Sequence, residues 1–129
     1  MPADGFFEWQ KQDKLRQPFF IRRKDQAPFA GLWERWKNRS DASVVRSCTI
    51  ITCPANELVA PIHDRMPVIL APAHHARWLD PAATDARSLL VPCPAAWLES
   101  FPVNPRVNNP RHDDVECIQP AFAQDSLAL

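Results

Sequence analysis

A glutamate flanked by aromatic residues is the first side chain in this sequence that predicts chemistry. Glu8 follows Phe7 and precedes Trp9, in a segment whose composition favours a β-strand. In a strand Phe6 and Glu8 share one face, and Phe7 and Trp9 share the other. Desolvation among such neighbours raises the pKa of a carboxyl group and suits it to general acid/base catalysis. The alternative interpretation is a glutamate at the solvent-facing rim, or one paired with an arginine.

A histidine fixed between two prolines is the second candidate. His63 lies in the run Ala-Pro-Ile-His-Asp-Arg-Met-Pro (60–67), where a predicted helix ends and a strand begins. Asp64 and Arg65 are its immediate polar neighbours. A histidine held in this way can transfer protons near neutral pH. The alternative interpretation is a structural histidine that hydrogen-bonds a loop carbonyl.

Several cations lie beside aromatic strands, as in proteins that bind single-stranded nucleic acid. They occur at 22–24 and again at 35–39, and the proline-bounded run 106–111 adds Arg106 and Asn108. Phosphate contacts combined with ring stacking are the usual means of binding a single strand. A solvated set of charges at strand ends is an equally good interpretation.

The histidine and cysteine spacings predict no metal site. His74 and His75 are adjacent on a predicted short helix, so their rings point about 100° apart. Cys48 and Cys53 bound one predicted strand and face opposite sides, and no Cys-x-x-Cys motif occurs. All four cysteines, which include Cys93 and Cys117, are expected to be free thiols that act as small buried hydrophobic residues.

The elements that must position these residues are mostly strands. Aromatic and β-branched runs predict strands at 6–9, 18–23, 29–36, 47–52 and 65–70, with a polar turn at 11–17. Short connections between the first strands favour an antiparallel meander. Helices are predicted at 55–61, where Asn56 offers an N-cap, and at 73–79, 82–90 and 94–100, followed by an extended segment at 102–109. The fold class is therefore α+β, with a mainly antiparallel, barrel-like sheet and a few short helices.

Composition limits the possibilities further. The 129 residues carry no net charge and are 46% apolar, which suits one folded domain, placed at 1–118, with a loose tail at 119–129. Zero net charge excludes a generally basic, histone-like DNA binder. No apolar run is long enough to span a membrane and no signal peptide is evident, so a cytoplasmic location is expected. Nucleotide-binding glycine motifs are absent from the sequence, and no cofactor is predicted.

A set of motifs distributed along nearly the whole chain resembles the SOS-response-associated peptidase family, the abasic-site processing proteins. The His-Asp-Arg-Met-Pro block and the block Ala-Asp-Gly-x-x-Glu-Trp are the most specific. The motifs occur in family order at 3–9, 30–34, 49–52, 55–56, 62–70, 78–79, 103 and 106–109.

The resemblance implies a DNA partner and a covalent reaction. Family members bind single-stranded DNA at an abasic site, and an N-terminal cysteine exposed by removal of the initiator methionine attacks the sugar aldehyde to form a thiazolidine crosslink. Glu8 matches the residue that moves protons during Schiff-base formation and reversal, and His63 matches the one that assists sugar ring opening. Thr52 matches a residue of the same pocket, and Arg65 lies where it can hold a phosphate. Peptidase and lyase activities are further family properties.

The sequence departs from the family at its amino-terminal end. Position 2 is proline where the family has its nucleophilic cysteine, and the motifs cover only the family's C-terminal half or a little more. We therefore expect a truncated form, monomeric when complete, that results from a truncated gene, from a start codon assigned too late, or from a split gene whose N-terminal half is encoded separately. Exposed apolar residues are then expected among Phe6, Phe7, Phe19, Phe20, Trp33 and Trp36. The alternatives are a non-catalytic single-stranded DNA-binding remnant and a small structural or interaction domain.

Overall fold

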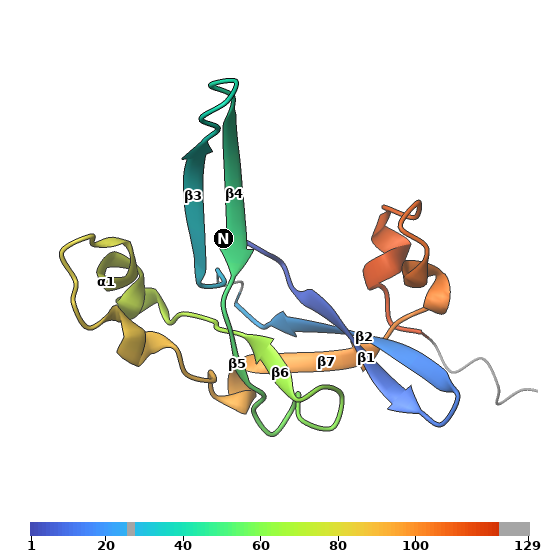
Figure 1. Cartoon of the computed structure of the whole chain (residues 1–129). Helices are drawn as coiled ribbons and strands as arrows, with labels where there is room; N and C mark the ends of the chain where they lie inside the picture. Colours follow the sequence, from blue (N-terminus) through green and yellow to red (C-terminus); the bar gives the residue numbers. More distant parts are fainter. Residues whose placement is uncertain (26–27, 122–129) are drawn as a thin grey trace, which may run out of the picture.

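Three antiparallel sheets and a few short helices make up the fold, as the computed structural model shows for residues 1–25 and 28–121 (Figure 1). The strands are β1 (Phe6–Gln12), β2 (Leu15–Arg23), β3 (Gly31–Lys37), β4 (Val44–Ile50), β5 (Thr52–Pro54), β6 (Arg65–Pro67) and β7 (Leu98–Pro102). The helices are α1 (His75–Leu79) and the 3-10 turns η1 (Pro72–His74), η2 (Ala86–Leu89), η3 (Ala95–Trp97), η4 (Pro105–Asn108) and η5 (Val115–Ile118). The predicted α+β class with mainly antiparallel strands is confirmed.

The first sheet has the strand order β1-β2-β7 and carries Glu8 on its edge strand, opposite Phe19 of β2. The β1–β2 hairpin is longer than the sequence indicates, because the polar residues predicted as a turn at 11–17 mostly continue both strands. Only two residues form the connection. Asp13 adopts a φ of 51°, a left-handed conformation that aspartate tolerates better than most residues. Backbone pairing thus extends the hairpin although its outer side chains are exposed.

The second sheet is a two-stranded ribbon of β3 and β4 that extends away from the rest of the molecule (Figure 1). Every residue of β4 is exposed, as are the six residues of β3 after Gly31. A predicted strand at 47–52 is in fact two strands, β4 and β5, separated at Ile51. The Ile51 amide still donates to the Ala30 carbonyl, in register with the β3–β4 pairing, but the Ala30 amide donates to the Val68 carbonyl and the ladder ends there.

The buried core lies below this ribbon, where β2, β5, β6 and β7 meet. Ile21, Met66, Val68, Leu98 and Val103 are among its fully buried side chains. Short β5 and β6 are held by backbone bonds, since the Val68 amide donates to the Ile51 carbonyl and the Ala30 amide to the Val68 carbonyl. This region joins the strand that carries Thr52 to the segment that carries His63.

Arg23 is the one buried charged residue in the described part of the chain. Its guanidinium stacks over the Trp97 ring, 4.2 Å from the centroid, and forms a two-contact ion pair with Asp25. The stacked arginine therefore fixes η3 against the end of β2.

Three of the predicted helices are wrong. Residues 55–61 form hydrogen-bonded turns, residues 82–90 contain only η2, and residues 94–100 contain η3 followed by β7. These segments are short and bounded by prolines, so too few hydrogen bonds could follow the first helical turn to offset the free-energy cost of forming it. Pairing with β2 instead draws 98–102 into the first sheet.

Other boundaries differ less. The predicted helix at 73–79 is η1 and α1. The strand predicted at 65–70 ends at Pro67, after which Ile69 forms an isolated bridge with Phe29. The segment predicted as extended at 102–109 contains η4. Of the predicted tail, Pro120 bridges to Val103, and 122–129 lie outside the described residues.

Apolar exposure is concentrated on the ribbon. Trp33 is 74% exposed and Trp36 is 55% exposed, as expected. Phe20 is only 4% exposed, because β7 pairs with β2 and places Phe101 against it. The expectation of exposure is therefore wrong for Phe20, and Phe6, Phe7 and Phe19 are half-buried rather than exposed.

Candidate functional site

Glu8 occupies a desolvated position on the edge strand β1. Its side chain is 23% exposed. Phe7 and Trp9 lie on the opposite face of the strand, with their ring centroids 6.5 Å apart. Burial raises the pKa of the Glu8 carboxyl above its ordinary value of 4.5, and the positive character of His63 opposes that rise. The carboxyl group is therefore disposed to hold a proton at a higher pH than a surface glutamate.

His63 is presented by a tight turn that begins at Asn56. The Asn56 side-chain oxygen accepts from the amides of Leu58 (3.2 Å) and Val59 (3.1 Å), and the His63 amide donates to the Val59 carbonyl at 2.9 Å. Asn56 was predicted to cap a helix, and it caps this turn instead. A local side-chain cap thus sets the path of the backbone that ends at His63.

A hydrogen bond from β1 holds the turn against the strand. The Gln10 side-chain amide donates to the Pro61 carbonyl at 3.0 Å. Gln10 lies two residues beyond Glu8, so both side chains project from the same face of β1. The bond therefore brings the segment that precedes His63 over the face that carries Glu8.

The result is a close acidic and basic pair. The Nδ1 atom of His63 lies 3.9 Å from Oε1 of Glu8 and 3.3 Å from Oδ1 of Asp64. The same Nδ1 lies 3.1 Å from both the amide nitrogen and the carbonyl oxygen of Arg65, so the tautomer determines which of the two it bonds. At 3.9 Å the Glu8–His63 pair interacts electrostatically, and a small movement or one water brings it within proton-transfer distance.

Arg65 and Thr52 complete this group. The Arg65 guanidinium donates to the Thr52 hydroxyl at 3.0 Å and to the Thr52 carbonyl at 2.8 Å. The β5–β6 pairing, with Pro54 opposite Arg65 and Thr52 opposite Pro67, places the two side by side. Four of the six site residues predicted from the sequence, Glu8, Thr52, His63 and Arg65, are thus connected through direct contacts.

The other two predicted site residues lie on η4. Asn108 accepts a 2.6 Å hydrogen bond from the indole nitrogen of Trp9, the neighbour of Glu8. These two line an open hollow of about 480 Å³, with Arg16, Val107 and Pro110. Arg106, by contrast, forms ion pairs with Asp114 and Glu116. Its role as a DNA contact stays a prediction.

The sequence analysis did not identify Gln10, Trp9 or Asp64 as parts of the site. Trp9 was considered only as a hydrophobic neighbour of Glu8. Its position directly after Glu8 was the one sequence feature that could have indicated a role in the site. No sequence pattern could have indicated a role for Gln10, because its hydrogen-bond partner is a backbone carbonyl 51 residues away. Asp64 was noted as a polar neighbour of His63 and proves to face the imidazole.

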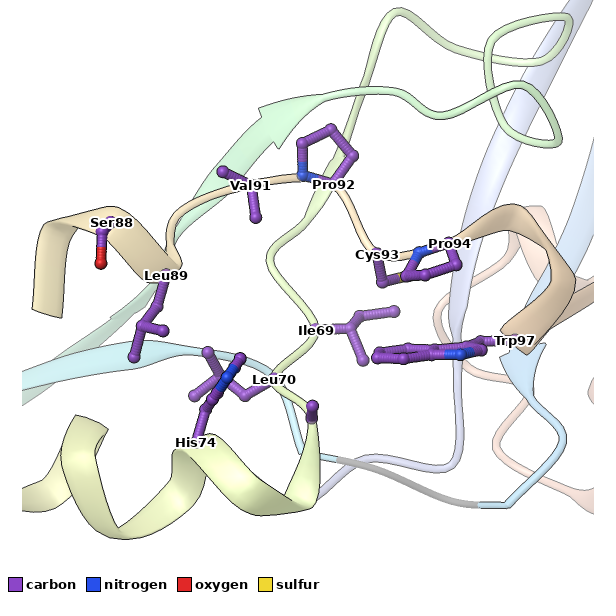
Figure 2. Close-up of a pocket in the computed structure, with 11 residues that line it drawn as sticks. Ile69, Leu70, His74, Ser88, Leu89, Val91, Pro92, Cys93, Pro94 and Trp97 are labelled. Carbon is purple, nitrogen blue, oxygen red and sulfur yellow. The ribbon is translucent and has the colours of Figure 1, made fainter.

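A separate apolar pocket of about 190 Å³ lies between residues 69–74, which end in η1, and the segment that leads to β7 (Figure 2). In Figure 2, His74 comes from the helical segment, Leu89 and Cys93 come from the opposite segment, and the Trp97 ring borders one end. Burial raises the pKa of the Cys93 thiol to about 11. None of the lining residues belongs to the Glu8–His63 group, and the pocket offers hydrophobic contact with few polar groups.

The cysteines are all free thiols, as predicted. Cys53, Cys93 and Cys117 are buried, whereas Cys48 is exposed on β4, so the prediction of burial is wrong for Cys48. Within residues 1–25 and 28–121, no group of three or more histidine, cysteine or acidic side chains is placed to hold a metal ion. In the same residues, no helix is long and apolar enough to cross a membrane.

Comparison with known proteins shows the family to which this sequence is similar. The family described as SOS response associated peptidase (SRAP) matches residues 1–110. The chain is 42% identical over 125 residues to the abasic site processing protein YoqW of Bacillus subtilis (strain 168). It is 33% identical over 140 residues to the abasic site processing protein HMCES of Gallus gallus. These matches span 92% of this chain, but 55% of the first protein and 42% of the second.

Solved structures share the fold. A crystal structure of a protein from Bacteroides thetaiotaomicron superimposes with a TM-score of 0.87 at 27% identity, covering 95% of this chain and 56% of that one. A protein from Bordetella bronchiseptica gives a TM-score of 0.72 at 32% identity, covering 81% of this chain and 53% of that one. The chain therefore spans about half the length of the relatives and structures that it matches.

Proposed function

Because the chain belongs to the SOS response associated peptidase family, we propose that it binds single-stranded DNA at an abasic site and moves protons at the lesion sugar. The observation that carries the proposal is the pairing of the Glu8 carboxylate with the His63 imidazole, 3.9 Å apart, beside Arg65 and Thr52. Relatives named abasic site processing proteins support the choice of substrate.

The pair suits the opening of an abasic sugar. The closed sugar is a cyclic hemiacetal, and opening moves a proton from the hydroxyl on C1′ to the ring oxygen, leaving an aldehyde. One group of the pair accepts the first proton while the other donates the second. A glutamic acid with a raised pKa can donate, and a neutral imidazole can accept. The same two groups then serve Schiff-base formation, in which an amine adds to the aldehyde and the protonated hydroxyl leaves as water.

The cationic side of the site suits the DNA backbone. Arg65 is exposed and oriented by its two bonds to Thr52, so its guanidinium is held in place before DNA arrives. On the other face of the edge strand β1, Trp9 and Asn108 border an open hollow that Arg16 also lines. We propose that Arg65 and Arg16 contact DNA phosphates, and that Trp9, held by its hydrogen bond to Asn108, contacts the nucleotide beside the lesion.

The covalent step needs a group that position 2 does not supply. Thiazolidine closure requires an α-amine next to a thiol, and residue 2 is proline. We therefore propose that the present residues supply DNA binding and proton transfer, and that crosslinking, peptidase and lyase activities require a cysteine from another segment. The chain incubated alone with abasic DNA is expected to give no heat-stable crosslink on a denaturing gel.

DNA binding is tested with two fluorescent single strands that differ only at one central position. One carries tetrahydrofuran, a stable abasic analogue, and the other carries thymidine. Fluorescence anisotropy should show tighter binding of the first strand, and Arg65→Ala should weaken it by about tenfold, the effect of one lost charge-assisted contact. Arg87→Ala removes the same charge from η2 and should leave binding unchanged. Equal affinity for both strands contradicts recognition of the lesion.

Proton transfer is tested by trapping the open aldehyde of a true abasic strand with methoxyamine at saturating concentration, where ring opening limits the rate. The parent chain should accelerate trapping, and Glu8→Gln or His63→Ala should each remove most of that acceleration, within the 10²–10⁴-fold range of general acid/base catalysis. His74→Ala is the matched control. Binding without acceleration would refute the catalytic part of the proposal and leave a DNA-binding domain.

A further inference from the structure

Every hydrogen bond and ion pair of the His63 imidazole within residues 1–25 and 28–121 is made through Nδ1. That atom lies 3.1 Å from both the amide nitrogen and the carbonyl oxygen of Arg65. It lies 3.3 Å from Oδ1 of Asp64 and 3.9 Å from Oε1 of Glu8. The His63 side chain is 44% exposed, so Nε2, the other ring nitrogen, is the atom that a bound molecule can reach.

The neighbours of Nδ1 favour a proton on that atom. A neutral imidazole carries its proton on Nδ1 or on Nε2, and the contacts of the two nitrogens decide between these tautomers. An unprotonated Nδ1 accepts from the Arg65 amide, but it then turns its lone pair toward the carboxyl groups of Asp64 and Glu8. A protonated Nδ1 instead faces three oxygen acceptors. Electrostatics therefore favours the Nδ1–H tautomer.

Asp64 is the neighbour that decides between the two tautomers. The amide and the carbonyl of Arg65 lie equally far from Nδ1, so their opposite preferences largely offset each other. The Glu8 carboxyl is farther away, and burial raises its pKa, which makes its carboxylate form less favourable. The Asp64 carboxylate is nearer, and within the described residues His63 is the partner in its only ion pair.

The backbone fixes Asp64 beside the ring. The Ala55 amide donates to the Asp64 carbonyl at 3.0 Å, and the next residue, Arg65, pairs with Pro54 of β5. The Asp64 side chain is 91% exposed, so water screens its interaction with the imidazole and the effect on His63 is modest. A modest effect is sufficient here, because the two contacts with Arg65 nearly balance.

We infer that Asp64 is a positioning residue that holds neutral His63 in its Nδ1–H tautomer and leaves Nε2 as the base that accepts the proton of the sugar hydroxyl. The choice of substrate rests on the proposed function. During ring opening the hydroxyl proton on C1′ passes to Nε2, the bond between C1′ and the ring oxygen breaks, and the Glu8 carboxyl gives its proton to that oxygen. The imidazolium that forms keeps its Nδ1–H toward Asp64, which stabilises the positive charge.

Two other histidines provide references for an NMR test of the tautomer. Nδ1 of His112 lies 2.8 Å from the Arg106 carbonyl oxygen, so that ring carries a proton on Nδ1. Nε2 of His75 lies 3.2 Å from the Leu70 carbonyl oxygen, so that ring carries a proton on Nε2. Long-range proton–nitrogen correlation spectra of the ¹⁵N-labelled chain distinguish these two patterns at about pH 8.5, where free histidine is neutral. The spectrum of His63→Ala identifies the signals of His63.

His63 of the parent should show the His112 pattern, and Asp64→Ala should move it toward the His75 pattern. Asp64→Glu retains a carboxylate and should retain the parent pattern. Asp113→Ala removes another exposed carboxylate and should change nothing. A parent His63 with the His75 pattern, or an unchanged pattern in Asp64→Ala, would overturn the inference. Unchanged signals of His75 and His112 show that a variant has kept its fold, and if Asp64→Ala has lost it, the parent spectrum and Asp64→Glu decide.

The rate of ring opening separates this inference from the proposed function. In the methoxyamine assay Asp64→Ala should reduce the acceleration about three- to fivefold, the effect of one exposed charge contact, and Asp64→Glu should restore it. Removal of a negative charge does not weaken attraction to phosphates, so slower trapping reports proton transfer rather than lost binding. A parent that shows the Nδ1–H pattern without acceleration would refute the proton-transfer proposal and leave the tautomer assignment standing. Acceleration that Asp64→Ala leaves unchanged would instead refute the role of Asp64.

Discussion

Removing the side chain of Asn56 should destabilise the turn that presents His63. The Asn56 oxygen caps the amides of Leu58 and Val59, and its NH₂ group donates to the Cys93 carbonyl at 2.9 Å. Loss of a capping acceptor costs about 1 kcal/mol, and loss of a half-buried amide-to-carbonyl hydrogen bond costs about 1 kcal/mol more. Asn56→Ala is therefore expected to lower the free energy of unfolding by about 2 kcal/mol.

Urea unfolding followed by tryptophan fluorescence measures this change by linear extrapolation. Asn56→Asp separates the two contributions, because it keeps the acceptors for the turn amides and replaces the donor to Cys93 with a carboxylate oxygen. Asn109→Ala is the matched control. Asn109 caps only the Arg111 amide, at 3.1 Å on the exposed surface, and its loss should cost less than about 0.5 kcal/mol.

The reasoning is refuted if Asn56→Ala costs no more than Asn109→Ala. A loss in Asn56→Asp as large as that in Asn56→Ala would assign the whole effect to the Cys93 contact and none to the cap. A change of about 2 kcal/mol with an unchanged denaturant slope would show that the turn is held as the hydrogen bonds indicate.

Three further outcomes follow from the same structure. Burial raises the pKa of Glu8, so the protonated carboxyl group stabilises the fold below about pH 4.5. That stabilisation is lost as the pH rises through the folded-state pKa. Glu8→Gln, which cannot ionise, should therefore gain stability over the parent between pH 4 and pH 7 in thermal melts. At pH 8 a thiol reagent mapped by mass spectrometry should label exposed Cys48 quickly and Cys93 slowly, since a thiol with a pKa of about 11 is ionised in only about one molecule in a thousand. Equal labelling would contradict the burial of Cys93. Amides of the β3–β4 ribbon should exchange hydrogen at least about tenfold faster than those of β2, and equal protection would mean that the ribbon is stable without packing.

The strands of the first half of the chain could be predicted because their aromatic and β-branched composition is a local property. Segments 6–9 and 18–23 lie within β1 and β2. The strand β7 could not be found in this way, because Leu98–Pro102 becomes a strand only by pairing with β2, and the preceding Pro94 indicated a helix. The turn after Asn56 has the cap of a helix without the length that a helix needs.

The candidate site shows the same division between local and long-range information. The sequence around Glu8 already predicts a desolvated carboxyl group. Its approach to His63 depends on the Gln10–Pro61 hydrogen bond and on the β5–β6 pairing, which no local pattern reveals. Here the expectation that Glu8 and His63 lie together came from the family resemblance, because 54 residues separate them in the sequence. The Trp9–Asn108 bond had no such guide, so Asn108 was expected to contact DNA directly rather than to hold an aromatic ring.

The distribution of charge shows that a chain with no net charge can keep an arginine free of carboxylate partners at the proposed DNA site. In the described residues Arg22, Arg23, Arg77 and Arg106 each form an ion pair with a carboxylate. Arg65 is held instead by the neutral oxygens of Thr52, so its charge is oriented without being cancelled. Carboxylates thus neutralise arginines that serve the fold, and the arginine beside Glu8 and His63 keeps its charge. Under the proposed function, local pairing and not the overall charge balance sets the potential that a phosphate would meet at this site.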